Sequence, residues 1–488
     1  MTLFDFQKEA IKKVREAIKR GNKRVGLQSP TGSGKTEMAI EMFKGAIKNG
    51  KKCIFCVSSV ELVNQTARRF EKYFPSISVV RANDKRRNLL ARISIMSTDT
   101  FYKRKDRPPI EFLESDFMII DEAHDCLSDK YKCLLNEWGD KVVVGLSATF
   151  QRIGKKGHGH WGEIVVSESG ENLRKMGILP NLKIFAPDIT YSTSGVKITA
   201  GDYNQTQLVS TMEANKTLYS DFEKEFKNRG GFEKKSIIFC VNIDHVKKMV
   251  SRLSDMGANP IEYHSQLSAK ELKDKKRMLA GHSFNSIPYT LVSVNKLSRG
   301  VDMPELEIGF MIRPTCSEVL YRQQVGRLTR GKKDVVLVDM TTNSKKFAHP
   351  YALREPDVTD IDKVDRKNNF SLKNCPVCFL VFDKKINFCP DCNYNLREEE
   401  LMNQKRRERE IAERKDQELK EISLNNSHYE KQIKRFSWIK KNKGHEYGLS
   451  SDWEYRKLYR ENKKEMTDQL KKIFLKLKRN NNWKSENL

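Results

Sequence analysis

The octapeptide Ser29-Pro30-Thr31-Gly32-Ser33-Gly34-Lys35-Thr36 decides the fold of the first part of the chain. A short apolar run at 25–27 precedes it and predicts a strand, and residues 37–47 carry apolar side chains at helical spacing. A strand, a glycine-rich turn and a helix form the setting of a phosphate-binding loop. In that setting, consecutive backbone N–H groups and the positive end of the helix converge on an anion. Lys35 would then reach the β- and γ-phosphates and the Thr36 hydroxyl would ligate Mg²⁺. The stretch therefore predicts a nucleoside triphosphate site formed by Ser29, Thr31, Gly32, Ser33, Gly34, Lys35 and Thr36, with Ser29 in place of the usual first glycine.

Composition limits what else the chain can be. Its 488 residues suffice for two large domains with appendages, and 32 % of them are charged, which indicates extended polar parts. The net charge of +27 favours polyanionic partners, with nucleic acid first and an anionic membrane second. We expect no membrane association, because no apolar run approaches the roughly 18 residues of a membrane span and no signal peptide is apparent. The ten cysteines follow no whole-chain disulfide pattern, so a reducing, cytoplasmic location is expected.

Near-continuous apolar runs recur along the chain and alternate with helical stretches. Such runs are typical of parallel strands that are buried on both faces, and they predict a doubly wound α/β fold. A first group precedes residue 150 and a second group lies between 182 and 340, so two α/β domains in tandem are expected. Only the first contains a phosphate loop. The clearest predicted strands are 53–57, 93–96, 117–120 and 142–146 in the first domain and 237–241, 290–294, 308–312 and 335–339 in the second.

The tetrapeptide Asp121-Glu122-Ala123-His124 directly follows one of these predicted strands. A carboxylate at the carboxyl end of a buried strand, in the domain that holds the phosphate loop, is where the Mg²⁺ of a nucleotide is bound. We expect Asp121 to bind Mg²⁺ through water. Glu122 is then placed to orient and deprotonate the attacking water.

Four cysteines near the C-terminal side form the pattern C-x₂-C-x₁₀-C-x₂-C. Four thiolates in two tight turns suit a tetrahedral Zn²⁺ with no open position, and the pattern predicts a structural zinc ribbon. Phe379, Phe382 and Phe388 are expected to form its small core. Whether the ribbon also contacts DNA stays open. The predicted ligands are Cys375, Cys378, Cys389 and Cys392.

Beyond the cysteines, the sequence becomes strongly charged. Residues 397–430 are dense in Glu, Lys and Arg and predict a helical spacer held by charge pairs between successive turns. Residues 431–488 carry 17 Lys and Arg against 7 Asp and Glu, interleaved with aromatic residues. Lysines neutralise phosphates and rings stack on bases, so this segment is expected to bind nucleic acid. A small helical domain with buried rings is the alternative.

The motifs together resemble those of a superfamily-2 helicase or translocase with a DEAH-type motif II, over roughly residues 1–345. Residues 29–36 resemble motif I, 121–124 motif II, 147–149 motif III, 298–302 motif V and 323–330 motif VI. The resemblance implies two RecA-like domains that bind ATP and Mg²⁺ between them. It also implies that Gln7 reads the adenine edge. The further residues that it suggests are Gln323 as a catalytic residue, Gly300 and Asp302 at the nucleotide, and Ser298, Arg299, Ser97 and Thr98 at the nucleic-acid backbone.

Two arginines of motif VI have a physical rationale of their own. Arg327 and Arg330 lie three residues apart, so they share one face if the segment is a helix. Presented from the second domain, they would stabilise the charge of the transferring phosphoryl group as arginine fingers, which contribute 10³–10⁵ in rate in the best-studied cases. ATP binding would then close the interdomain cleft and hydrolysis would open it, moving the domains along a strand.

The predicted organisation is therefore an ATP-dependent DNA helicase or translocase with appended nucleic-acid-binding parts. A weaker resemblance, carried by 145–149 and 176–180, is to branched-DNA helicases of the RecG/UvsW type. It implies forked or branched DNA as substrate, a role in DNA repair, recombination or replication, and a monomer or weak oligomer. An RNA helicase and an ATP-switched DNA-binding scaffold stay open as alternatives. The expected domains are a RecA-like ATP-binding domain (1–160), a second RecA-like domain (161–350), a linker (351–374), the zinc ribbon (375–396), the charged spacer (397–430) and the basic segment (431–488).

Overall fold

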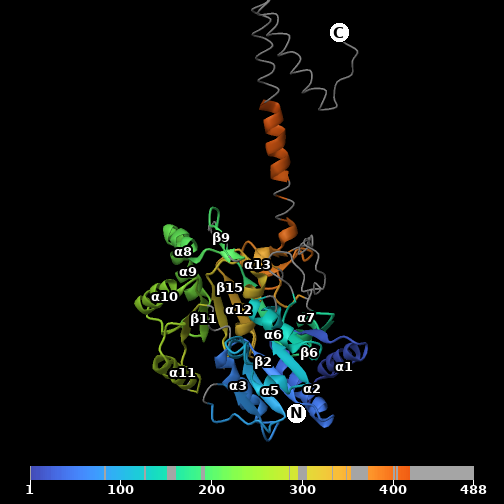
Figure 1. The fold of residues 1–488 in the computed structure, drawn as a ribbon. Helices are drawn as coiled ribbons and strands as arrows, with labels where there is room; N and C mark the ends of the chain where they lie inside the picture. The colour runs from blue at the N-terminus through green and yellow to red at the C-terminus, as the bar shows by residue number, and fades with distance from the viewer. Residues whose placement is uncertain are drawn as a thin grey trace, which may run out of the picture. The chain divides into compact units, whose positions relative to one another are not determined.

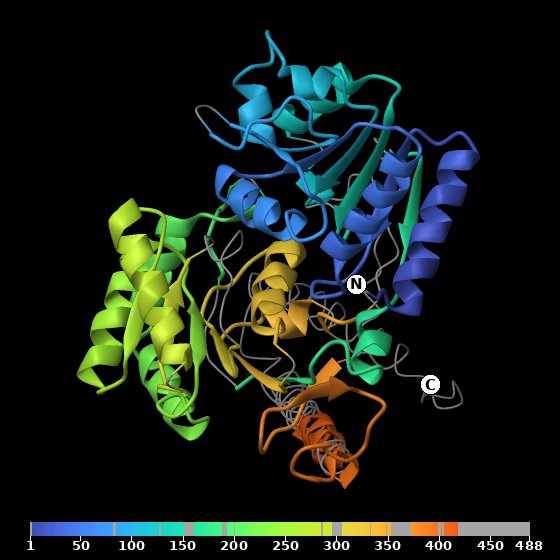
Figure 2. The same cartoon turned by 90° about the horizontal axis from the view of Figure 1, so that it is seen from below.

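The computed structural model of the protein divides into two compact units, Met1–Leu396 and Arg397–Leu488. The first unit holds two parallel sheets with their helices, and each sheet with its helices forms a separate body in Figures 1 and 2. The structure describes residues 2–81, 84–125, 128–150, 161–187, 193–199, 201–284, 286–294, 305–331, 333–347, 349–352, 372–398, 402 and 405–417.

The first sheet has the strand order β3-β4-β2-β5-β6-β1-β7, and every pairing in it is parallel. Its two faces are buried, as the apolar runs predict, because alternate strand residues enter two separate hydrophobic clusters. One cluster includes α1, α2 and α3, and the other includes α4, α5 and α6. The strands are β1 (Arg24–Gln28), β2 (Cys53–Val57), β3 (Ser78–Val80), β4 (Ile93–Ser97), β5 (Phe117–Asp121), β6 (Val142–Ser147) and β7 (Glu163–Val166). The helices are α1 (Asp5–Lys19), α2 (Lys35–Lys48), α3 (Val60–Phe70), α4 (Thr98–Tyr102), α5 (Ile110–Leu113), the 3₁₀ turn η1 (Ala123–Asp125) and α6 (Asp129–Trp138).

Two glycines in neighbouring strands of this sheet make room for large aromatic rings. Gly26 in β1 pairs with Gly145 in β6. A Cβ on Gly145 would lie 2.2 Å from the ring of Trp161, and one on Gly26 would lie 2.9 Å from the ring of Phe150. The two rings contact each other edge to face, with centroids 5.7 Å apart. The paired glycines are therefore required by packing and not by backbone conformation.

The second sheet has the order β12-β13-β11-β14-β15-β8 and is also entirely parallel. Clusters of buried apolar residues again cover both faces, one with α7, α11 and α12 and the other with α9 and α10. The strands are β8 (Leu182–Phe185), β11 (Ser236–Phe239), β12 (Pro260–Tyr263), β13 (Thr290–Ser293), β14 (Ile308–Met311) and β15 (Val335–Asp339). The helices are α7 (Gly170–Lys175), α8 (Gln205–Ala214), α9 (Lys216–Asn228), α10 (Ile243–Asp255), α11 (Ala269–Phe284), α12 (Glu318–Leu328) and α13 (Asn343–Lys346).

The two-sheet architecture confirms the predicted tandem α/β fold. The predicted boundary between the domains, at residue 160, falls before β7, yet β7 pairs with β1 and so extends the first sheet. A separate hairpin of β9 (Ile198–Thr199) and β10 (Asp202–Tyr203) precedes α8 in the second domain.

The cysteine-rich module is a small antiparallel hairpin, β16 (Leu372–Asn374) and β17 (Val381–Asp383), attached to the second sheet. The N–H of Ala186, just past β8, donates to the carbonyl of Phe379 at 2.8 Å, and the Arg229 guanidinium donates to the carbonyl of Cys378 at 3.0 Å. The prediction that Phe388 lies in the core of the module is wrong, since its ring is 53 % exposed. The core contains Phe382, as predicted, together with Leu380, Leu396, Phe185 of β8 and the buried cysteines Cys375 and Cys389.

In the second unit, residues 405–417 form an exposed helix within the predicted charged spacer. Arg406 and Glu410 form an ion pair of 3.8 Å on successive turns of it, as the sequence predicts. The predicted basic segment, 431–488, and the predicted linker between 353 and 371 lie outside the described residues. Among the residues that the structure describes, no helix is both long enough and apolar enough to span a bilayer.

Candidate active site

The phosphate loop lies between β1 and α2, and two of its glycines adopt conformations that other residues rarely adopt. Gly32 has φ +85° and Gly34 has φ +83°, in the left-handed region. A Cβ on Gly34 would also lie 2.4 Å from the Gln7 amide nitrogen, and one on Gly32 would lie 2.9 Å from Leu179. Gly34 is the N-cap of α2, so the backbone N–H groups at the start of this helix line the loop.

Ser29, which replaces the usual first glycine, has a structural use for its hydroxyl. Its Oγ donates to Ser33 Oγ at 2.6 Å and accepts from Ser167 Oγ at 2.7 Å. Ser167 follows β7 at the start of the connection to the second domain. The substitution therefore ties the phosphate loop to that connection by a chain of three hydroxyls.

Gln7 lies behind the phosphate loop. Its side chain is only 4 % exposed, and its amide nitrogen donates to the carbonyl of Ser33 at 2.8 Å. The amide oxygen accepts from the Phe4 N–H at 3.0 Å. The amide nitrogen thus holds α1 against the loop, while the amide oxygen caps the start of α1 itself. A role in reading adenine stays a prediction.

Lys35, Thr36, Asp121 and Glu122 meet in one cavity of about 480 Å³. Lys35 Nζ donates to the carbonyls of Ser29 and Pro30, within its own loop, at 2.9 and 3.2 Å. Burial lowers the pKa of Lys35, opposed by the adjacent carboxylates. Burial, together with the charge of Glu122, raises the pKa of Asp121 to about 6. Two adjacent carboxyls in a buried site, beside the Thr36 hydroxyl, form an oxygen donor set that fits Mg²⁺.

Glu122 adopts an unusual backbone conformation directly after β5. Its φ of 54° lies in the left-handed region, which costs a non-glycine residue energy and is concentrated at functional sites. Its N–H donates to Asp121 Oδ1 at 3.0 Å. The turn brings its carboxylate into the same cavity as the carboxylate of Asp121.

A hydrogen-bond chain crosses from the first domain to the second through His124. The amide nitrogen of Gln323 donates to His124 Nε2 at 3.0 Å, so the ring proton is on Nδ1, which donates to Ser147 Oγ at 3.1 Å. Ser147 Oγ in turn donates to the carbonyl of Thr149 at 2.6 Å. The predicted motifs II, III and VI are therefore connected by direct contacts.

Helix α12 brings Arg327 to the opposite wall of this cavity. Arg330 reaches it from the turn that follows, because the helix ends at Leu328, so the two arginines do not share one helix face as the sequence suggests. Arg327 and Arg330 both line it, across from Lys35 and Asp121. Arg327 is 8 % exposed, and its Nε and Nη1 have no hydrogen-bond partner among the described residues. Gly326 permits the approach, because a Cβ there would lie 2.9 Å from Thr31 of the phosphate loop. Such a buried cation is suited to an anionic ligand.

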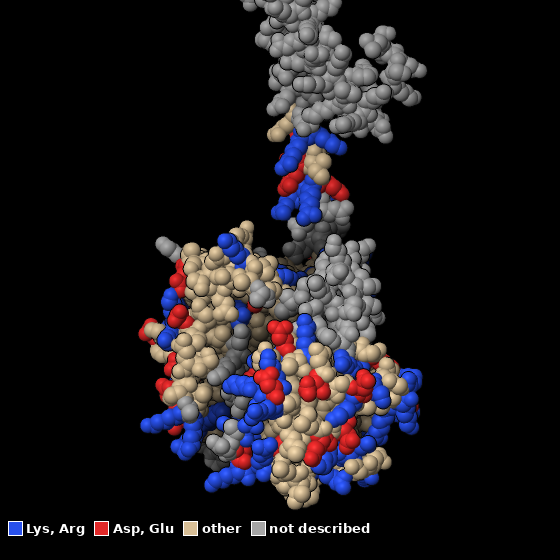
Figure 3. Space-filling model, in the orientation of Figure 1, with Lys and Arg blue, Asp and Glu red and all other residues tan. Residues whose placement is uncertain are grey.

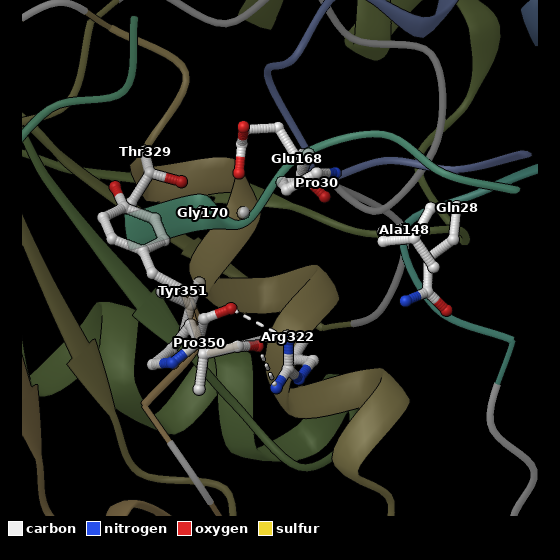
Figure 4. Close-up of a pocket in the computed structure, with 14 residues that line it drawn as sticks. Gln28, Pro30, Ala148, Glu168, Gly170, Arg322, Thr329, Pro350 and Tyr351 are labelled. Carbon is white, nitrogen blue, oxygen red and sulfur yellow. Dashed lines mark hydrogen bonds between the residues drawn. The ribbon is translucent and has the colours of Figure 1, made fainter. Parts of the chain in front are cut away.

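Arg322, which the sequence did not single out, also lines this cavity, one turn before Gly326. Its guanidinium donates to the carboxylate of Glu318, to the carbonyl of Pro350 at 2.9 Å and to the carbonyl of Ala352 at 3.1 Å. Figure 4 shows the bonds of Arg322 to the two backbone carbonyls, beside a second, much smaller cavity of about 40 Å³ that Pro30 and Thr31 of the phosphate loop also line. Arg322 thus holds the end of the second domain against motif VI. No motif pattern signals this role, since the acceptors are backbone carbonyls.

Four of the predicted motif V residues lie outside the described residues. They are Ser298 and Arg299, predicted at the nucleic-acid backbone, and Gly300 and Asp302, predicted at the nucleotide. Ser97 and Thr98 are buried, and Ser97 Oγ accepts from the N–H of Thr100 at 3.1 Å as the N-cap of α4. The structure therefore gives Ser97 a capping role and does not bring either hydroxyl to the surface.

The four cysteines of the module lie together, with their sulfur atoms all within 4.8 Å of one another. Sulfur atoms pair at 3.5 Å between Cys375 and Cys392 and between Cys378 and Cys389. Four sulfurs in such a cluster are compatible with a tetrahedral zinc site.

Comparison with known proteins supports this reading of the core. Residues 1–152 match the family described as type III restriction enzyme, res subunit, and residues 219–332 match the helicase conserved C-terminal domain. These matches support a superfamily-2 helicase, which is a nucleic-acid-dependent ATPase.

Individual relatives of this helicase core are distant. A 51.5 kDa protein of a Lactococcus phage (isolate 7-9) is 25 % identical over 79 % of this chain and 81 % of its own length. IRC3 of Saccharomyces cerevisiae, named as a candidate ATP-dependent helicase, is 26 % identical over 67 % of this chain. The match covers 49 % of IRC3, so the chain spans about half the length of that relative.

A solved structure, titled as the ATP-dependent type ISP restriction-modification enzyme LlaBIII bound to DNA, shares the fold. It aligns with a TM-score of 0.51 at 17 % identity, over 70 % of this chain and 27 % of its own. This likeness concerns the fold of the helicase core alone.

Proposed function

We propose that the protein is an ATP-dependent DNA helicase or translocase that unwinds or remodels branched or forked DNA. The observation that carries the proposal is one cavity between the two domains. Lys35, Asp121 and Glu122 line it from the first domain, and Gln323, Arg327 and Arg330 line it from the second. A site built from both domains changes when they move, so hydrolysis in it can be coupled to movement along a strand.

The roles of the residues follow from their chemistry. Lys35 and the N–H groups at the start of α2 bind the phosphates, and Thr36 and Asp121 hold Mg²⁺, which would neutralise charge on the transferring phosphoryl group. Glu122 orients the attacking water and accepts its proton. Arg327 and Arg330 stabilise the charge that spreads over the γ-phosphoryl oxygens. The four cysteines of the module hold a structural Zn²⁺.

The preference for DNA is supported by composition and by the relatives. The net charge of +27 favours a polyanion, and in Figure 3 basic side chains are spread over the face shown, with acidic ones between them. The structural neighbour is titled as bound to DNA, and a type I restriction endonuclease subunit of Escherichia coli (EcoAI) is 23 % identical over 75 % of this chain. Motors of this class grip the nucleic-acid backbone, so RNA is the competing substrate to be tested.

The decisive experiment measures ATP hydrolysis by the full chain with single-stranded, duplex, forked and four-way DNA and with RNA of equal length. We expect the largest stimulation with forked or four-way DNA and the weakest with RNA. Lys35→Ala and Glu122→Gln should abolish stimulated hydrolysis while DNA binding persists. Full hydrolysis in either variant would contradict the assignment of the ATPase site. Equal stimulation by RNA would contradict DNA as the preferred substrate. Hydrolysis without displacement of a labelled strand or movement along DNA would favour an ATP-switched scaffold.

A further inference from the structure

Asp202, on the second strand of the β9–β10 hairpin, contacts the chain segment that leads into motif VI. Its Oδ1 accepts from the Thr315 hydroxyl at 2.9 Å and from the Cys316 N–H at 2.8 Å. Its Oδ2 accepts from the guanidinium of Arg313 at 3.1 Å. More than a hundred residues separate Asp202 from these partners in the sequence, so the contacts exist only in the folded chain.

The contacts continue into helix α12 through two hydroxyls. The Thr315 hydroxyl that donates to Asp202 also accepts from the Ser317 N–H at 2.9 Å. Ser317 is the N-cap of α12, and its Oγ accepts from the N–H of Leu320 at 3.2 Å. Thr315 and Ser317 are buried, so these bonds do not exchange with water. A carboxylate beside the N-terminus of a helix is also favoured by the helix dipole.

Helix α12 carries the residues on which the proposed hydrolysis depends. Gln323, which binds His124, and Arg327, which lines the cavity, both belong to it. A helix moves as a rigid body over such a short length, so the position of its first turn fixes where these side chains lie. A displacement of about 1 Å at a reacting centre can cost on the order of 10²-fold in rate.

We propose that Asp202 is a positioning residue for ATP hydrolysis, which holds the N-terminal end of α12 so that Gln323 and Arg327 face the nucleotide. It does not touch the nucleotide cavity itself. The expected effect on ATP hydrolysis rests on the proposed function. The expected effect on the position of α12 does not. The hairpin thereby becomes part of the ATPase machinery, although it lies outside every predicted motif.

A stabilising role for Asp202 must be separated from a positioning role. Arg313 is only 3 % exposed, so Asp202→Ala removes a carboxylate from a buried cation and is expected to destabilise the fold. The double variant Asp202→Ala/Arg313→Met removes the cation as well and should recover most of the thermal stability. It does not restore the acceptor for Thr315 and Cys316.

The test compares the steady-state ATPase of the full chain at saturating DNA for this double variant, Thr315→Val and Thr199→Ala. Thr199 lies exposed on the same hairpin and serves as the control. We expect kcat to fall about 10-fold or more in the double variant and in Thr315→Val, with KM for ATP within about 2-fold and Thr199→Ala unchanged. A wild-type kcat in the double variant, or in a folded Thr315→Val, would overturn the proposal.

A second measurement does not depend on activity. Amide hydrogen exchange at the start of α12, including Leu320, should become about 10-fold faster in Thr315→Val and in the double variant, but not in Thr199→Ala. Unchanged protection there would also overturn the proposal. If the wild-type chain hydrolysed no ATP with any nucleic acid, the proposed function would fail, whereas the exchange data would still decide whether Asp202 holds α12.

Discussion

The amide of Gln323 lies 3.0 Å from Nε2 of His124, and this bond joins the two domains directly beside the carboxylates of Asp121 and Glu122. Because His124 also donates to Ser147 at the end of β6, a change in the separation of the domains would shift a hydrogen bond at the carboxyl edge of the first sheet. The bond is therefore a direct means by which the state of the cleft can be reported to motif III.

Removing this bond should uncouple hydrolysis from DNA. We expect Gln323→Ala to lower DNA-stimulated kcat about 10-fold, corresponding to the loss of one hydrogen bond of roughly 1–1.5 kcal/mol. Binding of ATP should change little, since Lys35 and the loop are untouched. Steady-state kinetics with and without DNA measure both effects. Gln205→Ala, at an exposed position of α8, is the control, and an unaltered kcat in Gln323→Ala would refute the coupling.

Gly145 should not tolerate even one added carbon. Gly145→Ala places a Cβ against the Trp161 ring, and we expect it to lower the free energy of unfolding by about 1–3 kcal/mol. Adding Trp161→Phe should restore part of this loss, because the ring that clashes becomes smaller. Urea denaturation measures both. Gly281→Ala in α11, where nothing lies within 4 Å of the added carbon, should be neutral or stabilising. Equal effects at the two glycines would contradict the packing argument.

Removing metal from the cysteine module should loosen the edge of the second sheet. The module contacts the end of β8 at Ala186 and the end of α9 at Arg229, so unfolding it removes partners from both. We expect one zinc per chain by elemental analysis, and its loss in Cys389→Ser. Compared with the wild type, Cys389→Ser should be cleaved more readily by proteases after residue 372 and should show faster hydrogen exchange in β8. Cys133→Ser, outside the cluster, is the control. A metal-free wild-type chain with an intact module would exclude the zinc site.

Acid should destabilise the second domain through two buried histidines. Burial lowers the pKa of His245 to about 4, and that of His349 to about 4 as well. In the unfolded chain a histidine titrates near 6.5, so between about pH 6.5 and 4 the unfolded state binds more protons. Stability is thus fully present above about pH 6.5 and falls as the pH decreases, by up to about 1.4 kcal/mol per pH unit for each histidine. Urea denaturation between pH 7.5 and 5 measures this loss.

The contribution of one of these histidines can be isolated. His245→Gln keeps an acceptor for the Val241 N–H but cannot be protonated, so its stability should fall less steeply with pH. His282→Gln on α11 is the matched control. An unchanged pH dependence in His245→Gln would show that other groups govern the acid transition.

The strands that could be predicted from sequence are those buried on both faces. Runs such as 53–57 and 117–120 contain only apolar residues, because helices cover both sides of them, and this leaves a clear pattern. β3, β7 and β12 were not singled out, because they are short and contain polar residues such as Glu163 and Glu262. Where β7 belongs depends on its pairing with β1, which no local pattern reveals.

Within the site, residues of compact motifs were predicted and residues acting from a distance were not. Lys35, Asp121 and Glu122 belong to short patterns whose chemistry can be read from adjacent positions, and the cavity contains them. Arg322 and Asp202 bind backbone atoms and hydroxyls of remote segments, so their sequence neighbours carry no signal. Phe388 was misassigned because an aromatic residue between cysteines suggests a core, whereas Phe185 of β8 supplies the ring that is needed.

One consequence of the Gln7 contacts concerns the engineering of nucleotide preference. The same amide group that is predicted to face adenine is bonded to Ser33, and it blocks any side chain at Gly34. If Gln7 reads adenine as predicted, base selectivity and phosphate affinity share a single side chain. A substitution at position 7 that is designed to accept guanine would also alter the shape of the loop, so the two properties could not be tuned independently.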